Sequence, residues 1–221
     1  MQARKLMWVA VYAVAMAYVE AAAVVYLRRI YGIVDLLRDV APYDPRIAGI
    51  ELGREAATLV MILAVGLAAG RSVQTRLGFA CFAFGTWDIV YYVWLRVMLG
   101  WPDSLLAPDI LFLIPLPWWG PVLSPVLVAL LSVVGGALAV VHDDRGRALR
   151  PDTAAWAALL AGAVAILYAF MADALRVLPA SAEALGRLRP TAFNWPVFLA
   201  GYLAMIWAVR RAGRSGARGP A

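Results

Sequence analysis

Residues 77–99 read LGFACFAFGTWDIVYYVWLRVML, an apolar stretch of 23 residues with a single acid, Asp88, near its centre. About 20 apolar residues are enough for a helix to cross a hydrocarbon core roughly 30 Å thick. A carboxylate costs about 2.5–3.5 kcal/mol at that depth on insertion scales, and such acids usually face the interior of a helical bundle. The stretch therefore predicts a transmembrane helix that contributes to a buried polar site.

Five further apolar stretches of similar kind lie along the chain. Each is bounded by charged residues or by Pro and Gly, as transmembrane helices usually are. The six expected spans are about 6–27, 48–70, 77–99, 120–141, 153–175 and 193–209. We expect an all-α, polytopic transmembrane bundle that forms one domain over residues 1–209, followed by a disordered, basic cytoplasmic tail at 210–221.

The composition supports a membrane protein. Hydrophobic residues make up 64% of the 221 positions, charged residues only 15%, and the mean hydropathy is +0.77. So little polar surface cannot cover a water-soluble globule of this size. The net charge of +6 is scattered over loops and ends, so we expect membrane lipids as partners and no nucleic acid.

The distribution of basic residues predicts the orientation of the bundle. With the N-terminus in the cytoplasm, 11 of the 20 basic residues fall in cytoplasmic segments: Arg4, Lys5, Arg71, Arg76, Arg145, Arg147, Arg150, Arg210, Arg211, Arg214 and Arg218. Because cytoplasmic loops are enriched in Lys and Arg, we expect both termini in the cytoplasm. The expected location is the cell membrane, which in a bacterium is the cytoplasmic or inner membrane.

Residues 100–125 (GWPDSLLAPDILFLIPLPWWGPVLSP) break the helical pattern, since they contain six of the chain's thirteen prolines. No regular helix tolerates that density of proline. Asp109 is expected to cap a short apolar segment that stops at Pro115. The segment is either a re-entrant element beside a cavity or an outer-surface loop in the aromatic belt.

Helical rise predicts which intramembrane charges meet. At 1.5 Å per residue, Asp88 lies roughly 16 Å from the cytoplasmic side, Glu20 roughly 21 Å and Glu55 roughly 20 Å. Arg54 adjoins Glu55, and Tyr92 follows Asp88 by one turn. These five residues form the expected binding site for a substrate or an ion.

A second set of polar residues is expected nearer the outer rim. It comprises Glu51, Arg96, Asp109, Asp173 and Arg176. Glu51 lies one turn before Glu55, and the spacing of Asp173 and Arg176, three residues apart, supports an ion pair. Such residues also serve as interfacial anchors, so a structural role is the alternative.

Several site classes are excluded by missing residues. The chain has one histidine, His142, and one lysine, Lys5, which leaves no ligand set for haem or a di-iron centre and no core lysine for a retinal Schiff base. Glu20, Glu55 and Asp88 offer oxygen ligands of the kind that Mg²⁺ accepts, but no spacing pattern indicates a metal. We therefore expect neither a cofactor nor a metal.

Three functions are compatible with these patterns. The first is a transporter or binding protein for a proton, a cation or a small polar substrate, because proton relays and ion pathways use intramembrane acids. The second is an intramembrane enzyme that acts on a lipid or isoprenoid headgroup, with Arg54 or Arg96 holding phosphate. The third is an accessory subunit of a larger membrane complex, with partner membrane subunits.

Overall fold

The computed structural model describes residues 2–33, 39 and 44–215, and most of them are helical. Each of the six expected spans lies on one long helix, with its ends displaced by a few residues. The elements are α1 (Gln2–Tyr31), α2 (Pro45–Ala69), α3 (Val73–Leu99), β1 (Pro108–Phe112), β2 (Trp118–Pro121), α4 (Leu123–Asp144), α5 (Thr153–Arg176), α6 (Ala182–Gly186) and α7 (Trp195–Ser215).

Local sequence signals explain several of the helix ends. The Asp44 side chain accepts a backbone N–H of the first turn of α2, and Pro45 takes the first helical position. Ser72 and Thr75 form a capping box at the start of α3. That helix ends at Gly100, whose φ of 71° favours glycine.

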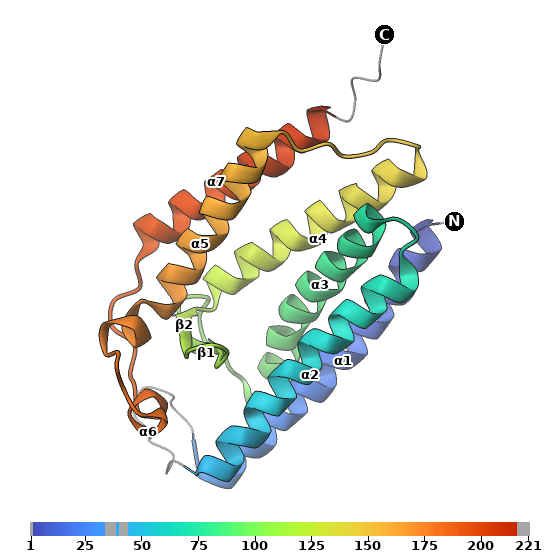
Figure 1. Ribbon diagram of the computed structural model, residues 1–221. Helices are drawn as coiled ribbons and strands as arrows, with labels where there is room; N and C mark the ends of the chain where they lie inside the picture. The colour runs from blue at the N-terminus through green and yellow to red at the C-terminus, as the bar shows by residue number, and fades with distance from the viewer. Residues whose placement is uncertain (1, 34–38, 40–43, 216–221) are drawn as a thin grey trace.

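The helix α3 is the centre of the first half of the chain. Helices α1, α2 and α4 pack on it, and the pair α5 and α7 lies on the far side of α4 (Figure 1). Small residues allow close packing: Ala13 and Ala17 of α1 are fully buried, and a Cβ on Gly85 of α3 would collide with the carbonyl oxygen of Ala129 in α4. This packing holds the acidic faces of the first three helices close together.

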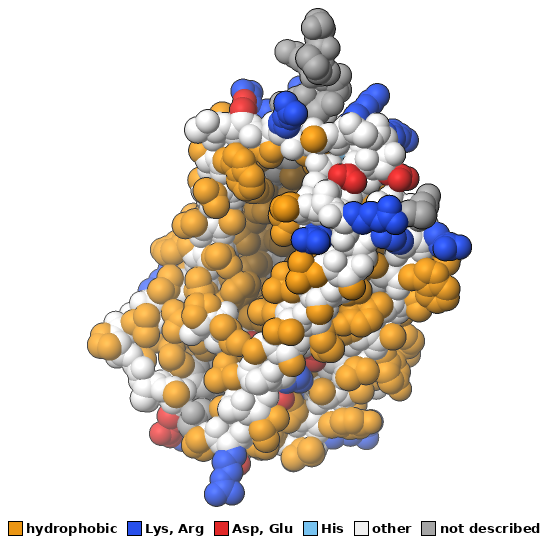
Figure 2. Space-filling model, turned by 45° about the vertical axis from the view of Figure 1, so that its right-hand side comes forward, with side chains coloured by type: hydrophobic (Ala, Val, Ile, Leu, Met, Phe, Trp, Pro, Cys, Tyr) orange, Lys and Arg blue, Asp and Glu red, His pale blue; other side chains and the backbone are white. Residues whose placement is uncertain are grey.

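Five helices, α1 to α5, are long and apolar enough to cross a membrane. Their exposed large side chains include Trp8, Val19, Leu63 and Val164. On the face drawn in Figure 2, hydrophobic side chains cover the middle, and most charged ones gather toward the two ends. The chain is therefore a multi-pass membrane protein.

The sixth long helix, α7, packs antiparallel to α5 (Figure 1). The two approach closely, because a Cβ on Gly162 would lie 2.6 Å from the carbonyl oxygen of Gly201. Arginines in its last turns lower its mean hydropathy, and a sixth crossing stays a prediction. The helix continues past residue 209, where we expected a tail to begin, to Ser215; residues 216–221 lie outside the described part of the chain.

The proline-rich segment contains a short antiparallel hairpin of β1 and β2. The prediction that Asp109 caps a short helical segment is wrong, because Asp109 lies in β1 opposite Gly120. Prolines lack an N–H and restrict the preceding residue to extended backbone, which suits strand ends and turns. With Asp109 and Trp119 buried, the hairpin is packed against the helices; its depth in the membrane stays a prediction.

Candidate functional site

A cavity of about 190 Å³ lies between α1, α2, α3 and the hairpin. Its lining includes five carboxyl groups and two guanidinium groups, and we call it the acidic cavity. Those charged residues are Glu20, Glu51, Glu55, Asp88, Asp109, Arg28 and Arg54. All five residues of the expected main site line it, namely Glu20, Arg54, Glu55, Asp88 and Tyr92.

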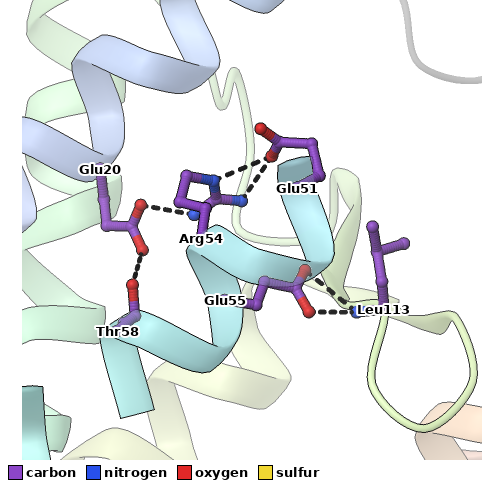
Figure 3. A network of polar contacts seen from close by, with 6 residues as sticks. All are labelled: Glu20, Glu51, Arg54, Glu55, Thr58 and Leu113. Atoms are coloured by element: carbon purple, nitrogen blue, oxygen red, sulfur yellow. Dashed lines mark hydrogen bonds and ion pairs between the residues drawn. The ribbon is translucent and has the colours of Figure 1, made fainter. Parts of the chain in front are cut away.

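One wall of the acidic cavity is an ion-pair network between α1 and α2 (Figure 3). Arg54 lies between two carboxylates, pairing with Glu20 and with Glu51, whose Oε2 lies 2.8 Å from Nη2. The hydroxyl of Thr58 donates to the other oxygen of Glu20. Because every charge in this wall has a partner, the ion pairs and the Thr58 hydrogen bond offset the cost of burying the Glu20 side chain.

Glu55 points away from this network, toward the hairpin (Figure 3). Its two carboxylate oxygens accept the backbone N–H of Leu113 at 2.8 and 3.1 Å. Leu113 directly follows β1, so the contact joins the middle of α2 to the end of that strand. Glu55 therefore positions the hairpin that closes one side of the acidic cavity.

Asp109 lies on β1 and joins that strand to α1 and α3. Its Oδ2 accepts a 3.1 Å hydrogen bond from the Tyr92 hydroxyl, and its Oδ1 lies 3.7 Å from Nη2 of Arg28. The guanidinium of Arg28 also lies 4.2 Å from the ring centre of Trp101. Burial raises the pKa of Asp109 to about 6, although Arg28 and the Tyr92 hydrogen bond act in the opposite direction.

Asp88 differs from the other acids of the cavity. Its side chain is buried, yet no described residue forms a hydrogen bond or ion pair with its carboxylate. The neighbouring Nε1–H of Trp87, which also lines the cavity, is buried and lacks a hydrogen-bond partner among the described residues. An unpaired carboxylate in such surroundings is costly unless a proton or another cation neutralises it.

Aromatic rings form much of the remaining wall. Trp87, Tyr91, Tyr92 and Phe112 all line the cavity. Trp87 stacks on Tyr91 with ring centroids 6.3 Å apart, and its centroid is also 6.3 Å from that of Phe112. The faces of such rings attract cations, most strongly where water is excluded.

The expected rim residues separate into two groups. Glu51 and Asp109 line the acidic cavity, whereas Arg96 donates to the carbonyl oxygens at the exposed end of α3, including that of Pro102 at 3.0 Å. Arg96 thus lies at the end of α3, away from the acidic cavity.

The other two rim residues lie elsewhere. Asp173 is 3.3 Å from Arg176 and accepts the backbone N–H of Thr191 at 2.9 Å. All three line a second cavity, of about 330 Å³, between α5, β2 and the link before α7. Asp173 and Arg176 thus belong to a different part of the bundle from the acidic cavity.

Sequence reasoning missed Arg28 and Thr58 as parts of this site. Arg28 lies just after the first expected span, and its contacts with Asp109 and Trp101 depend on the fold of the proline-rich segment. Thr58 carried a usable signal, because it lies one turn after Arg54 on the same face of α2.

Comparisons with known proteins give no relative for this chain: no family model, no curated protein and no solved structure matches it. Within the described residues, no group of three or more His, Cys, Asp or Glu side chains is placed to hold a metal ion. The site must therefore be interpreted from its own geometry.

Proposed function

We propose that the protein binds and transports a small monovalent cation of the ammonium type, which occupies the acidic cavity. The observation that carries the proposal is the buried carboxylate of Asp88, which has no hydrogen-bond or ion-pair partner among the described residues. It lies in a cavity whose described lining has five carboxyl groups and two guanidinium groups. A bound cation places a positive charge beside the Asp88 carboxylate. This attraction lowers the free energy of the occupied cavity.

The charge arrangement supports a cation over an anion. Both guanidinium groups that line the cavity already pair with carboxylates, Arg54 with Glu20 and Glu51, and Arg28 with Asp109. Arg96, the other candidate for holding phosphate, lies at the exposed end of α3. The enzyme hypothesis requires a guanidinium available to a phosphate, so the geometry favours it less.

The size and walls of the acidic cavity support an ammonium group over a large polar group. A volume of about 190 Å³ is below the ~300–1,000 Å³ of pockets for drug-sized ligands. The aromatic rings of Trp87, Tyr91 and Tyr92 suit a soft organic cation, as in the aromatic cages that bind quaternary ammonium groups.

Transport also requires a route to water, and Arg28 occupies the proposed one. A neighbouring hollow of about 300 Å³ is lined by Arg29, Gly32, Leu99 and Trp101, and it shares Arg28 and Ile33 with the acidic cavity. We propose that Arg28 moves away from Asp109 to admit the ion. The proposed topology has α7 as a sixth crossing and both termini in the cytoplasm.

Calorimetric titration of the purified protein in lipid nanodiscs tests this function. Tetramethylammonium chloride should release or absorb heat saturably, whereas sodium phosphate at the same ionic strength should not. Saturable phosphate binding without tetramethylammonium binding would instead support the headgroup enzyme. Partner chains that co-purify with the protein, together with an absence of ion binding, would support the accessory subunit.

A further inference from the structure

We infer that the ligand of the acidic cavity is amphipathic: an ammonium head that carries one alkyl chain, with the chain lying in a hollow between α1 and α2. This inference rests on the proposed function and specifies its substrate class. It follows from two neighbouring spaces of opposite character that meet at one ion pair.

The α1–α2 hollow has a volume of about 320 Å³. Its lining is almost wholly apolar and comes from two helices only: Tyr12, Ala15, Met16, Val19, Glu20 and Ala23 of α1, and Arg54, Ala57, Thr58 and Met61 of α2. The helices both pack on α3, and the small side chains of Ala15, Ala23 and Ala57 leave space between them. The volume and the apolar lining of the hollow therefore suit a hydrocarbon chain.

The hollow and the acidic cavity share two lining residues, Glu20 and Arg54. Their ion pair thus lies at the boundary where the two spaces meet. An ammonium head beside Glu20 and Asp88 places a chain attached to it at this boundary, next to the hollow. The two volumes together fall in the ~300–1,000 Å³ range of pockets that enclose whole small molecules.

The outer side of the hollow faces the surface of the bundle. Val19 is 68% exposed and Met61 is 42% exposed, so a chain can enter sideways from the bilayer. Moving a chain from lipid into this hollow yields no hydrophobic gain, because lipid tails are equally apolar. The hollow therefore guides and orients the chain, while the acidic cavity supplies the affinity through charge.

Photolabelling of the full chain in nanodiscs tests the placement of the chain. The probe is dodecyltrimethylammonium with a diazirine in the middle of its chain, and labelled peptides are mapped by mass spectrometry. We expect labels on the peptides that contain Met16, Val19 and Met61, and suppression of these labels by excess tetramethylammonium. Labels spread over α4, α5 and α7, or labels at the hollow that tetramethylammonium does not suppress, would overturn the inference.

A matched pair of variants tests the hollow itself. Ala57→Leu adds a side chain inside the hollow, and Ala56→Leu makes the same change at an exposed position outside it. Filling the hollow should remove the diazirine labels of the dodecyl probe from the peptides that contain Met16, Val19 and Met61, while the affinity of the probe, which the acidic cavity supplies, stays nearly unchanged. Ala57→Leu should leave tetramethylammonium affinity unchanged.

The pair also separates the two proposals. Equal labelling of these peptides in both alanine variants would overturn the chain placement and leave the proposed function standing. Absence of tetramethylammonium binding in the unmodified protein would remove the proposed function as well.

Discussion

The hydroxyl of Tyr92 donates a 3.1 Å hydrogen bond to Asp109 and thereby joins α3 to β1 across the wall of the acidic cavity. A second tie, from Glu55 to the backbone N–H of Leu113, fastens the other end of the same strand to α2. The hairpin is thus held at two points by side chains that face the cavity. Its position, and with it the shape of the site, depends on polar contacts that replacement can test.

Tyr92→Phe removes the first tie without a change of ring. Loss of one buried hydrogen bond should lower the free energy of unfolding by about 1–2 kcal/mol. Denaturant titration of the protein in micelles, followed by tryptophan fluorescence, measures this change. Tyr26→Phe is the control, since Tyr26 is exposed and its replacement should have little effect. Equal stabilities of the two variants would contradict the role given to Tyr92.

Glu55→Ala removes the second tie and leaves the Leu113 N–H without its acceptor. The expected loss is about 1–3 kcal/mol, the usual cost of an unsatisfied buried group. Glu55→Gln keeps one acceptor oxygen and should retain much of the stability. Glu183→Ala serves as the control, because Glu183 forms only an exposed ion pair with Arg187. If Glu55→Ala and Glu183→Ala have the same free energy of unfolding, the contact between Glu55 and Leu113 does not hold the hairpin.

Arg54→Met should be the most destabilising of these replacements. It leaves the buried carboxylate of Glu20 without its cation, and breaking such a pair typically costs about 3–5 kcal/mol. Adding Glu20→Gln removes the orphaned charge, so the double variant should recover much of the loss. A double variant less stable than Arg54→Met alone would show that the ion pair is not the source of the effect.

The acidic cavity should bind cations less well as the pH falls through about 6, the pKa of buried Asp109. Above that pH the carboxylate is charged and attracts a cation; below it the group is neutral. The effect of Asp109 on folding has the opposite pH dependence, because burial favours the neutral form of its side chain. Its contribution to the free energy of unfolding is greatest below the pKa of the unfolded state and is lost as the pH rises through about 6.

Asp109→Asn isolates this effect. Tetramethylammonium affinity of the unmodified protein should fall several-fold between pH 7.5 and pH 5, and the variant should show a flatter dependence. The same measurement on Tyr26→Phe controls for changes in the lipid and the buffer. An unchanged pH profile in Asp109→Asn would assign the titration to another group.

The transmembrane helices were predictable from the sequence because span length follows directly from the thickness of a bilayer. The grouping of Glu20, Glu55 and Asp88 was predictable for a related reason, since helical rise sets the level of each residue and a costly charge turns inward. All three line one cavity. Their role in binding stays a prediction.

The hairpin was not predictable in the same way. Proline density showed that residues 100–125 break the helix, but the pairing of β1 with β2 is a contact between segments that no local signal specifies. The partners that depend on it, Arg28 with Asp109 and Glu55 with Leu113, were missed accordingly.

Replacement of Asp88 tests the central claim most directly. Asp88→Asn keeps the shape of the side chain and removes its charge, and Asp103→Asn does the same at an exposed position outside the acidic cavity. Calorimetry in nanodiscs at pH 7.5 should show tetramethylammonium binding weakened about tenfold or more in Asp88→Asn, the loss of about 1.4 kcal/mol or more, and unchanged in Asp103→Asn. Equal affinity in the two variants, both folded, would contradict the account.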